Sequence, residues 1–220
     1  MQRILTADGS YTIFNEAIGE HYHSAKGAVT ESRHVFIQSG LDFAAKLRKQ
    51  IVVLEVGLGT GLNALLSLQY GLQHDLSLQY IALELYPLAA GMALALQYPQ
   101  YIGAPELTPA FRLLHTSDNA TAFRINPGFS FTRHQTDVRD FNTNATFNLV
   151  YYDAFSPAAQ PHLWTRAIFE KLYGFMQTSA VLVTYSAKGQ IKRDLKSIGF
   201  TVESLPGAPG KREMIRAIKM

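Results

Sequence analysis

The stretch that decides the fold is IVVLEVGLGTGLN at residues 51–63. Residues 51–56 are nearly all apolar and partly β-branched, which is typical of a strand buried on both faces of a parallel sheet. The glycines that follow predict a tight turn, and residues 62–71 favour a helix. A strand, a glycine-rich turn and a helix form the first unit of an α/β fold.

Strand and helix patterns alternate along the rest of the chain. We expect strands at 78–84, 129–135, 147–153 and 179–186, helices at 87–98, 110–114, 163–175 and 188–198, and a closing strand pair at 200–205 and 214–220. This alternation predicts an α/β class with a mostly parallel, seven-stranded sheet and a C-terminal antiparallel hairpin. Upstream, residues 11–24 favour a short strand pair and 28–49 a helix. We therefore expect residues 1–50 to be an N-terminal extension packed on a domain at 51–220.

The composition excludes several classes of protein. With 220 residues, 47% hydrophobic and 17% charged, the chain can bury a sizeable core and is not disordered. The absence of cysteine excludes disulfides, thiolate metal sites and a cysteine nucleophile. No basic stretch precedes an apolar core at the start, and no window holds about 18 uninterrupted apolar residues, so we expect a cytoplasmic protein without a membrane span.

The net charge of +3 is unevenly distributed. Residues 188–220 hold eight Lys and Arg against three Asp and Glu, and residues 1–187 hold twelve against fourteen. From charge alone, a solvated helix face is the commoner explanation of such a segment, and contact with an anionic partner is the alternative.

Residues suited to bind a small molecule follow the first two strands. Gly57, Gly59 and Gly61 form a G-x-G-x-G turn behind Glu55, and this differs from the G-x-G-x-x-G spacing of a dinucleotide site. Such a turn brings backbone N–H groups against a ligand, or it is a purely structural loop. Glu84 ends the second strand, where a carboxylate accepts hydrogen bonds from ribose hydroxyls in α/β nucleotide sites.

The fourth strand ends in a second chemical motif, YYDAFSP at 151–157. Asp153 stands two residues before Phe155 and four before Pro157, so the carboxylate can accept a hydrogen bond from an amine while the ring stacks on a planar base. The alternative is that Asp153 caps the following turn and Phe155 packs beneath it.

Six segments together resemble one family. They are LEVGLGTGLNALLSL (54–68), ALELYPL (82–88), DAFSPAAQPHLWT (153–165), TYSAKGQIKRDLKSIGF (184–200), GKREM (210–214) and YHSAKGAVTESRHVFI (22–37). They are similar to the tRNA 5-methylaminomethyl-2-thiouridine methyltransferases, known as MnmD alone or as the N-terminal half of bifunctional MnmC. Two departures are the Pro-Gly-Ala-Pro-Gly loop before Lys211, where the family is more basic, and Ser156, where the family more often has Ala.

The resemblance implies a class I methyltransferase with a Rossmann-like fold and S-adenosylmethionine as cofactor. Its implied reaction moves the methyl group onto the amine of 5-aminomethyl-(2-thio)uridine at the wobble position of a tRNA anticodon stem-loop. A separate enzyme would supply the aminomethyl precursor. Since the oxidase half of the bifunctional proteins has no counterpart in the sequence, we expect no oxidase activity.

The resemblance also implies roles for individual residues. The implied cofactor contacts are Glu55, Gly57, Gly59, Gly61, Asn63, Glu84, Asp137, Val138 and Asp153, with Asp140 as the alternative to Asp137. Asp153 and Phe155 are the implied catalytic pair. The expected substrate contacts are Tyr22 and Glu31 in the pocket, and Lys188, Lys192, Lys211 and Arg212, beside Arg193 and Lys196, on RNA phosphates.

Other interpretations stay open. The seven histidines show no spacing with carboxylates that would bind a metal, and we predict no metal site. An aminopropyltransferase like spermidine synthase shares the architecture, but it needs an acidic pocket for a polyamine, and acids look sparse around Asp153. A non-catalytic RNA-binding module on the same fold is the third possibility.

Overall fold

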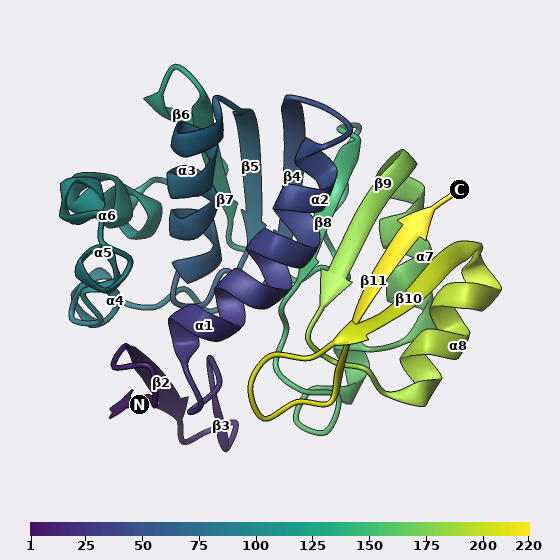
Figure 1. Ribbon diagram of the computed structural model, residues 1–220, viewed down its shortest axis with the longest axis horizontal. Coiled ribbons are helices and arrows are strands. Elements are labelled where there is room, and N and C mark those ends of the chain that lie inside the picture. The colour runs from purple at the N-terminus through teal and green to yellow at the C-terminus, as the bar shows by residue number, and fades with distance from the viewer.

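The structure, a computed structural model that describes residues 1–220, is organised around one sheet of eight strands (Figure 1). The strands are β4 (Gln50–Val56), β5 (Ser77–Leu83), β6 (Phe123–Asn126), β7 (Phe129–His134), β8 (Phe147–Tyr152), β9 (Met176–Thr184), β10 (Phe200–Pro206) and β11 (Glu213–Lys219), in the order β10-β11-β9-β8-β4-β5-β7-β6. The five central strands β9-β8-β4-β5-β7 are parallel, while β6 and β11 run antiparallel to their neighbours. The predicted α/β class and the antiparallel C-terminal hairpin are confirmed.

The sheet has one strand more than the seven predicted. β6 pairs with β7 through a turn at Pro127 and Gly128, and the side-chain oxygen of Asn126 accepts a hydrogen bond from the N–H of Gly128 (2.8 Å). The sequence prediction placed only turns and one helix in this region. A four-residue edge strand with no fully buried side chain shows too little alternation to be recognised from sequence.

The helices follow the prediction with local differences. They are α1 (Ala28–Ser32), a π-helical stretch (Arg33–Leu41), α2 (Asp42–Ala45), α3 (Leu62–His74), α4 (Ala90–Leu94), α5 (Tyr98–Tyr101), α6 (Thr108–Thr116), α7 (Arg166–Phe175) and α8 (Gly189–Ile198), with 3₁₀ turns at Pro105–Leu107 and Pro161–Leu163. The single helix predicted at 87–98 is two short helices, because Gln97 between them has a φ of 54° and ends the right-handed path.

Two hydrophobic clusters cover the two faces of the sheet. All six residues of β8 are buried, and alternate side chains enter opposite clusters: Tyr151 lies in one and Tyr152 in the other. The first cluster also contains Phe36 and residues of α3, and the second contains Phe169 of α7 and residues of α8. Figure 1 shows α1 and α2 crossing the front of the sheet. Burial on both faces explains why the strands are nearly continuous apolar runs.

The first residues form a small separate sheet, β1-β2-β3 (Gln2–Leu5, Tyr11–Asn15 and Glu20–His21), where a strand pair was predicted. Ile13 of β2 is buried in the first cluster, and the hydroxyl of Tyr98 donates to the carbonyl oxygen of Tyr11 (2.8 Å). In Figure 1 this sheet lies at the end of the molecule where β9 points, which is the carboxyl end of the parallel strands. The N-terminal segment therefore covers that end.

The order of the strands places a binding crevice at the same end. After β4 the chain adds β5 and β7 on one side, then β8 and β9 on the other. A parallel α/β sheet binds ligands outside the carboxyl ends of its strands at this reversal. None of the helices is long and apolar enough to pass through a membrane.

Candidate active site

A cavity of about 870 Å³ opens at the carboxyl ends of the parallel strands. Its wall comes from the ends of all five, at 56–60, 83–86, 136–139, 153–156 and Tyr185, together with Lys211 and the N-terminal segment. The volume falls in the range of small-molecule sites, roughly 300–1,000 Å³. Five strand ends and a covering segment thus enclose one site.

The glycine turn after β4 is pressed against its neighbours. Gly57 has a φ of 90°, and a Cβ there would lie 2.6 Å from the carbonyl oxygen of Asp153. Gly59 has a φ of 49°, and its Cβ would lie 2.8 Å from the ring of Tyr22. Only glycine fits both the left-handed backbone and the close approach. The turn therefore brings Asp153 and Tyr22 to the same wall of the cavity.

Most N–H groups of this turn are already bonded within the protein. The N–H groups of Gly57 and Leu58 both donate to the carbonyl oxygen of Leu83 (2.9 and 3.2 Å), and that of Gly59 donates to Oε2 of Glu84 (2.9 Å). The sequence analysis considered these N–H groups as hydrogen-bond donors to a ligand. The structure uses them to fix the turn to the end of β5.

Two neutral histidines hold Thr60 at the tip of the turn. Nε2 of His23 lies 2.6 Å from Oγ1 of Thr60, and Nε2 of His115 lies 3.1 Å from its carbonyl oxygen. Each histidine is 6% exposed, and burial lowers the pKa of each to about 4. The spacing of histidines along the chain gave no sign of this role.

Glu84 and Asp137 both line the cavity, and both already accept protein hydrogen bonds. The second oxygen of Glu84 accepts from the N–H of Tyr86 (2.9 Å), and burial raises its pKa. Asp137 accepts from the backbone N–H, Nε and Nη2 of Arg139 (2.8, 3.0 and 2.8 Å), and this guanidinium holds the pKa of the carboxyl below its usual range. Val138 lies beside it at 3% exposure. An adenine contact at Asp137 would therefore share the carboxylate with Arg139.

The buried side-chain amide of Asn63 donates a hydrogen bond to the carboxylate of Asp153. Nδ2 of Asn63 lies 2.8 Å from Oδ2 of Asp153 and 2.9 Å from Oε1 of Glu55. Burial raises the pKa of Asp153 to about 7, and the charge of Glu31 adds to this rise. Glu55 is fully buried with Oε2 unpartnered, and burial raises its pKa well above the usual value. Glu55, Gly61 and Asn63 do not line the cavity, so they support the wall and do not form its surface.

Aromatic rings lie next to Asp153. The rings of Tyr22 and Phe155 meet edge to face with centroids 4.9 Å apart. Nε1 of Trp164 donates to the carbonyl oxygen of Phe155 (2.7 Å), and Glu20 bonds both the N–H (2.9 Å) and the hydroxyl of Ser156. The loop after β8 is thereby fixed to the N-terminal segment. The sequence interpretation assigned no role to Glu20, which lies in no motif, or to Trp164, which lies within the family-like segment at 153–165.

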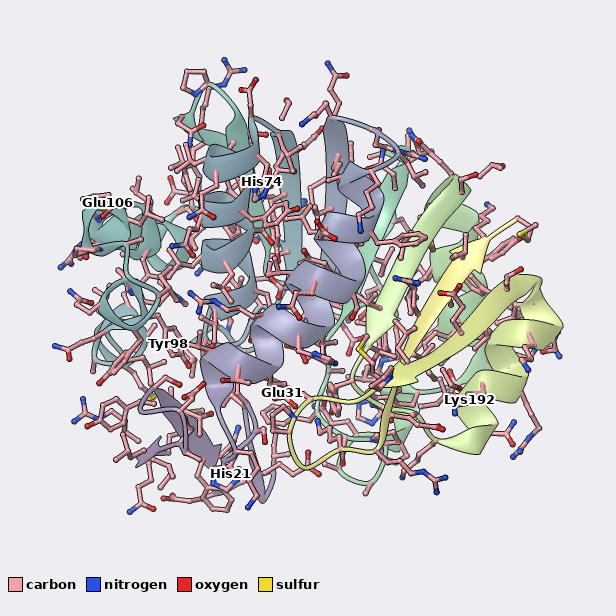
Figure 2. All side chains as sticks on the ribbon, viewed as in Figure 1. His21, Glu31, His74, Tyr98, Glu106 and Lys192 are labelled. Carbon is pink, nitrogen blue, oxygen red and sulfur yellow. The ribbon has the colours of Figure 1, made fainter.

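Glu31 and Lys211 meet across the cavity wall. Nζ of Lys211 lies 2.7 Å from Oε1 of Glu31 and 3.7 Å from the centroid of the Tyr185 ring. Figure 2 shows Glu31 at the end of the molecule near the loop that precedes β11. Lys211 thus lines the cavity, and Tyr185 is a cavity residue that the sequence interpretation did not single out.

The other predicted RNA contacts lie outside the cavity. Lys192, labelled on α8 in Figure 2, pairs with Glu213 (2.5 Å). Lys188, Lys196 and Arg212 are exposed and make no ion pair. No group of three or more His, Asp or Glu side chains is placed to hold a metal ion.

Comparison with known proteins shows which proteins this chain resembles. Residues 122–220 match a family described as S-adenosyl-L-methionine-dependent methyltransferase. The tRNA 5-methylaminomethyl-2-thiouridine biosynthesis bifunctional protein MnmC of Azoarcus sp. (strain BH72) is 30% identical over 93% of this chain and 34% of its own. The MnmC protein of Cupriavidus metallidurans is 28% identical over 96% of this chain and 33% of its own. The crystal structure of MNMC2 from Aquifex aeolicus superposes with a TM-score of 0.79 at 26% identity, over 98% of this chain and 69% of that chain.

The chain is thus an S-adenosyl-L-methionine-dependent methyltransferase that is similar, over nearly its whole length, to part of the MnmC proteins. It spans about a third of the length of the curated MnmC proteins that it matches. A solved spermidine synthase from Thermotoga maritima covers 96% of this chain and 69% of its own at 15% identity and a TM-score of 0.50, a likeness in fold alone.

S-adenosylmethionine is therefore the cofactor of this methyltransferase. The cavity is large enough for it, and the lack of a Cβ at Gly57 and Gly59 lets the turn approach Asp153 and Tyr22 closely at the cavity wall. Glu84 keeps lone pairs for ribose hydroxyls beyond the two N–H groups that it accepts. The residues present fit the cofactor at the ends of β4 and β5.

Proposed function

We propose that this methyltransferase transfers the methyl group of S-adenosylmethionine to the primary amine of 5-aminomethyl-(2-thio)uridine at the wobble position of tRNA, giving 5-methylaminomethyl-(2-thio)uridine. The observation that carries the proposal is the position of Asp153, which lines the same cavity as the glycine turn and follows β8 directly. The MnmC relatives are named for the biosynthesis of 5-methylaminomethyl-2-thiouridine in tRNA, which supports this nucleoside as the product.

The amine needs a group that takes its proton. A primary alkylamine resembles the Lys side chain, with a pKa of about 10.4, and is mostly protonated at neutral pH. Asp153 has a pKa of about 7, so its carboxylate accepts a hydrogen bond and then a proton from the amine near neutral pH. The hydrogen bond also directs the nitrogen lone pair that remains.

The rings beside Asp153 suit a flat base. Phe155 and Tyr22 both line the cavity, and Phe155 offers a face on which a uracil turned out of the anticodon loop stacks. The sulfonium of S-adenosylmethionine supplies an activated methyl group, so alignment of the amine carries much of the rate. Phe155 and Asp153 together hold the base and its amine in one orientation.

In this proposal the protein binds the tRNA anticodon stem-loop as its partner and works in the cytoplasm. Lys188, Lys196 and Arg212 are exposed and have no acidic partner, so they are available to RNA phosphates. Lys192 and Lys211 are paired with Glu213 and Glu31 and contribute less free charge. A separate enzyme would supply the aminomethyl group.

Radioactive methyl transfer tests the proposal. Bulk tRNA from cells that lack the activity is incubated with labelled S-adenosylmethionine and the protein, and its nucleosides are then separated. Label in 5-methylaminomethyl nucleoside is the expected result. Label in another nucleoside, or none in tRNA, contradicts the proposal.

Aminopropyl transfer is the second candidate, because the cavity is more acidic than the sequence suggested. Five carboxylates line it: Glu20, Glu31, Glu84, Asp137 and Asp153. The expectation that acids are sparse around Asp153 was wrong, since the topology brings together residues far apart in the chain. All five, however, are already bonded within the protein, in this order to Ser156, Lys211, Gly59, Arg139 and Asn63. Incubation with decarboxylated S-adenosylmethionine and a diamine should yield no polyamine.

A further inference from the structure

The ammonium group of Lys211 is held in a cage of one carboxylate and one aromatic ring. Its Nζ lies 2.7 Å from Oε1 of Glu31 and 3.7 Å from the centroid of Tyr185. A carboxylate and an aromatic face together bind a primary alkylammonium through a charge-assisted hydrogen bond and a cation–π contact. The cage therefore fits a chemical class, and Lys211 is one member of that class.

Both walls of the cage are fixed before any ligand arrives. Glu31 is 6% exposed, and its second oxygen accepts a hydrogen bond from the N–H of Ser24 (2.8 Å). The hydroxyl of Tyr185 donates to the carbonyl oxygen of Ala154 (2.9 Å), which ties the ring to the residue after Asp153. Two anchored walls form a built site that survives the departure of the lysine.

The cage adjoins the proposed methyl acceptor position. Glu31, Tyr185 and Asp153 line one cavity, and the charges of Glu31 and Lys211 shift the pKa of Asp153 in opposite directions. A substrate whose amine sits in the cage would therefore have Asp153 as its neighbour.

Lys211 can leave without burying its charge. Its side chain is 34% exposed, and it follows Gly210, whose φ is 88°. The next residue, Arg212, is exposed. A lysine that swings outward would join the surface that faces the RNA in the proposed function.

We infer that Glu31 and Tyr185 form the subsite for the protonated aminomethyl group of the substrate, and that Lys211 fills this subsite in the free protein. This inference rests on the proposed function. The incoming ammonium displaces the lysine and binds the same carboxylate and ring. Its N–H bond then breaks as the carboxylate of Asp153 takes the proton, which leaves the lone pair on nitrogen.

Calorimetry with the free nucleoside 5-aminomethyluridine tests the competition without RNA phosphates. Lys211→Met removes the competing cation, so this variant should bind the nucleoside about threefold to tenfold more tightly than the unmodified protein. The gain is modest because an ion pair with an exposed partner and a cation–π contact each contribute little free energy. Tyr185→Leu removes one wall and should bind it at least about threefold more weakly. Tyr185→Phe keeps the ring and is the matched control. The unmodified protein and the three variants should all bind uridine, which lacks the amine, with the same affinity. Equal or weaker binding of 5-aminomethyluridine by Lys211→Met overturns the inference.

A second measurement needs no variant. Acetic anhydride acetylates exposed amines, and a brief pulse of it, limiting with respect to protein and nucleoside, leaves most of the 5-aminomethyluridine unreacted. Mass spectrometry then gives the ratio of acetylated Lys211 to acetylated Lys196 in the same sample. This ratio should rise when 5-aminomethyluridine is added and stay unchanged with uridine. No rise at Lys211 contradicts the inference. If the protein methylates wobble uridine but fails these tests, only the cage is refuted; if tRNA receives no methyl group, the proposed function itself fails.

Discussion

The side-chain amide of Asn63 joins Asp153 to a second, fully buried carboxylate. One nitrogen, Nδ2, lies 2.8 Å from Oδ2 of Asp153 and 2.9 Å from Oε1 of Glu55. Because an amide nitrogen has two hydrogens, each carboxylate receives one. The hydrogen bond lowers the pKa of Asp153 against the larger effect of burial, which raises it to about 7. Asn63 thus fixes the direction of the Asp153 carboxyl group and offsets part of the rise in its pKa that burial causes.

The first prediction concerns this hydrogen bond. If ionised Asp153 is required, methyl transfer rises with pH through about 7. Asn63→Leu removes a donor that favours the charged form, so the pKa of Asp153 should rise and the acid limb of kcat/KM should move to higher pH. A pH–rate profile of both proteins checks this. An unshifted limb with a merely lower plateau would show that Asn63 acts only on packing.

The second prediction concerns Asp153 itself. Asp153→Asn keeps the shape of the side chain but cannot take a proton, so the rate of methyl transfer should fall by about 10²- to 10⁴-fold. Binding of S-adenosylmethionine, measured by calorimetry, should persist. Asp140→Asn is the control, because Asp140 is exposed and does not line the cavity. Near-normal turnover of Asp153→Asn would remove this residue from the mechanism.

The third prediction concerns Gly57. Gly57→Ala places a methyl group 2.6 Å from the backbone oxygen of Asp153 at a φ of 90°, so it should lower the free energy of unfolding by about 1–3 kcal/mol and weaken cofactor binding. Gly91→Ala is the matched control. Gly91 lies in α4 with nothing within 4 Å of a Cβ, and there alanine should stabilise the helix by about 0.5–1 kcal/mol. Chemical denaturation measures both, and equal effects would show that the turn tolerates a side chain.

The fourth prediction concerns RNA binding. If Lys188, Lys196 and Arg212 each contact one phosphate, the affinity for tRNA should fall with salt at a log–log slope of roughly −2 to −3. The double variant Lys188→Glu, Lys196→Glu should bind more weakly with a flatter slope. Arg124→Glu is the control, since Arg124 is exposed on β6, at the opposite end of the molecule from the N-terminal sheet in Figure 1. Equal losses in both proteins would show a general charge effect.

The fifth prediction concerns His115. Its folded pKa of about 4 lies below the ordinary value of 6.5, so the unfolded state binds more protons between these values and stability falls as pH drops through this window. From pH 7.5 to pH 5 this single group costs about 2 kcal/mol. His115→Gln should lose correspondingly less over the same range. Thermal unfolding at the two pH values checks this, and parallel losses would assign the pH dependence to other groups.

Local patterns were enough for the framework of the fold. The buried strands at 51–56 and 147–153 are recognisable because burial on both faces demands continuous apolar residues, and the glycine turn is recognisable because a positive φ favours glycine. The position of Asp153 follows from the same logic, since the carboxyl ends of parallel strands share one edge. The edge strand β6 escaped prediction because its pairing with β7, and not its own composition, makes it a strand.

By itself, then, the sequence determined the class of fold, the glycine turn and the carboxylate at the end of β8, since each depends on residues a few positions apart. Only the tertiary structure decided which partners those groups have. Glu31 and Lys211 are separated by 180 positions and Asn63 and Asp153 by 90, and no local period relates them. Packing brings them together, and burial then raises the pKa of Asp153 to a value that its position in the chain could not indicate.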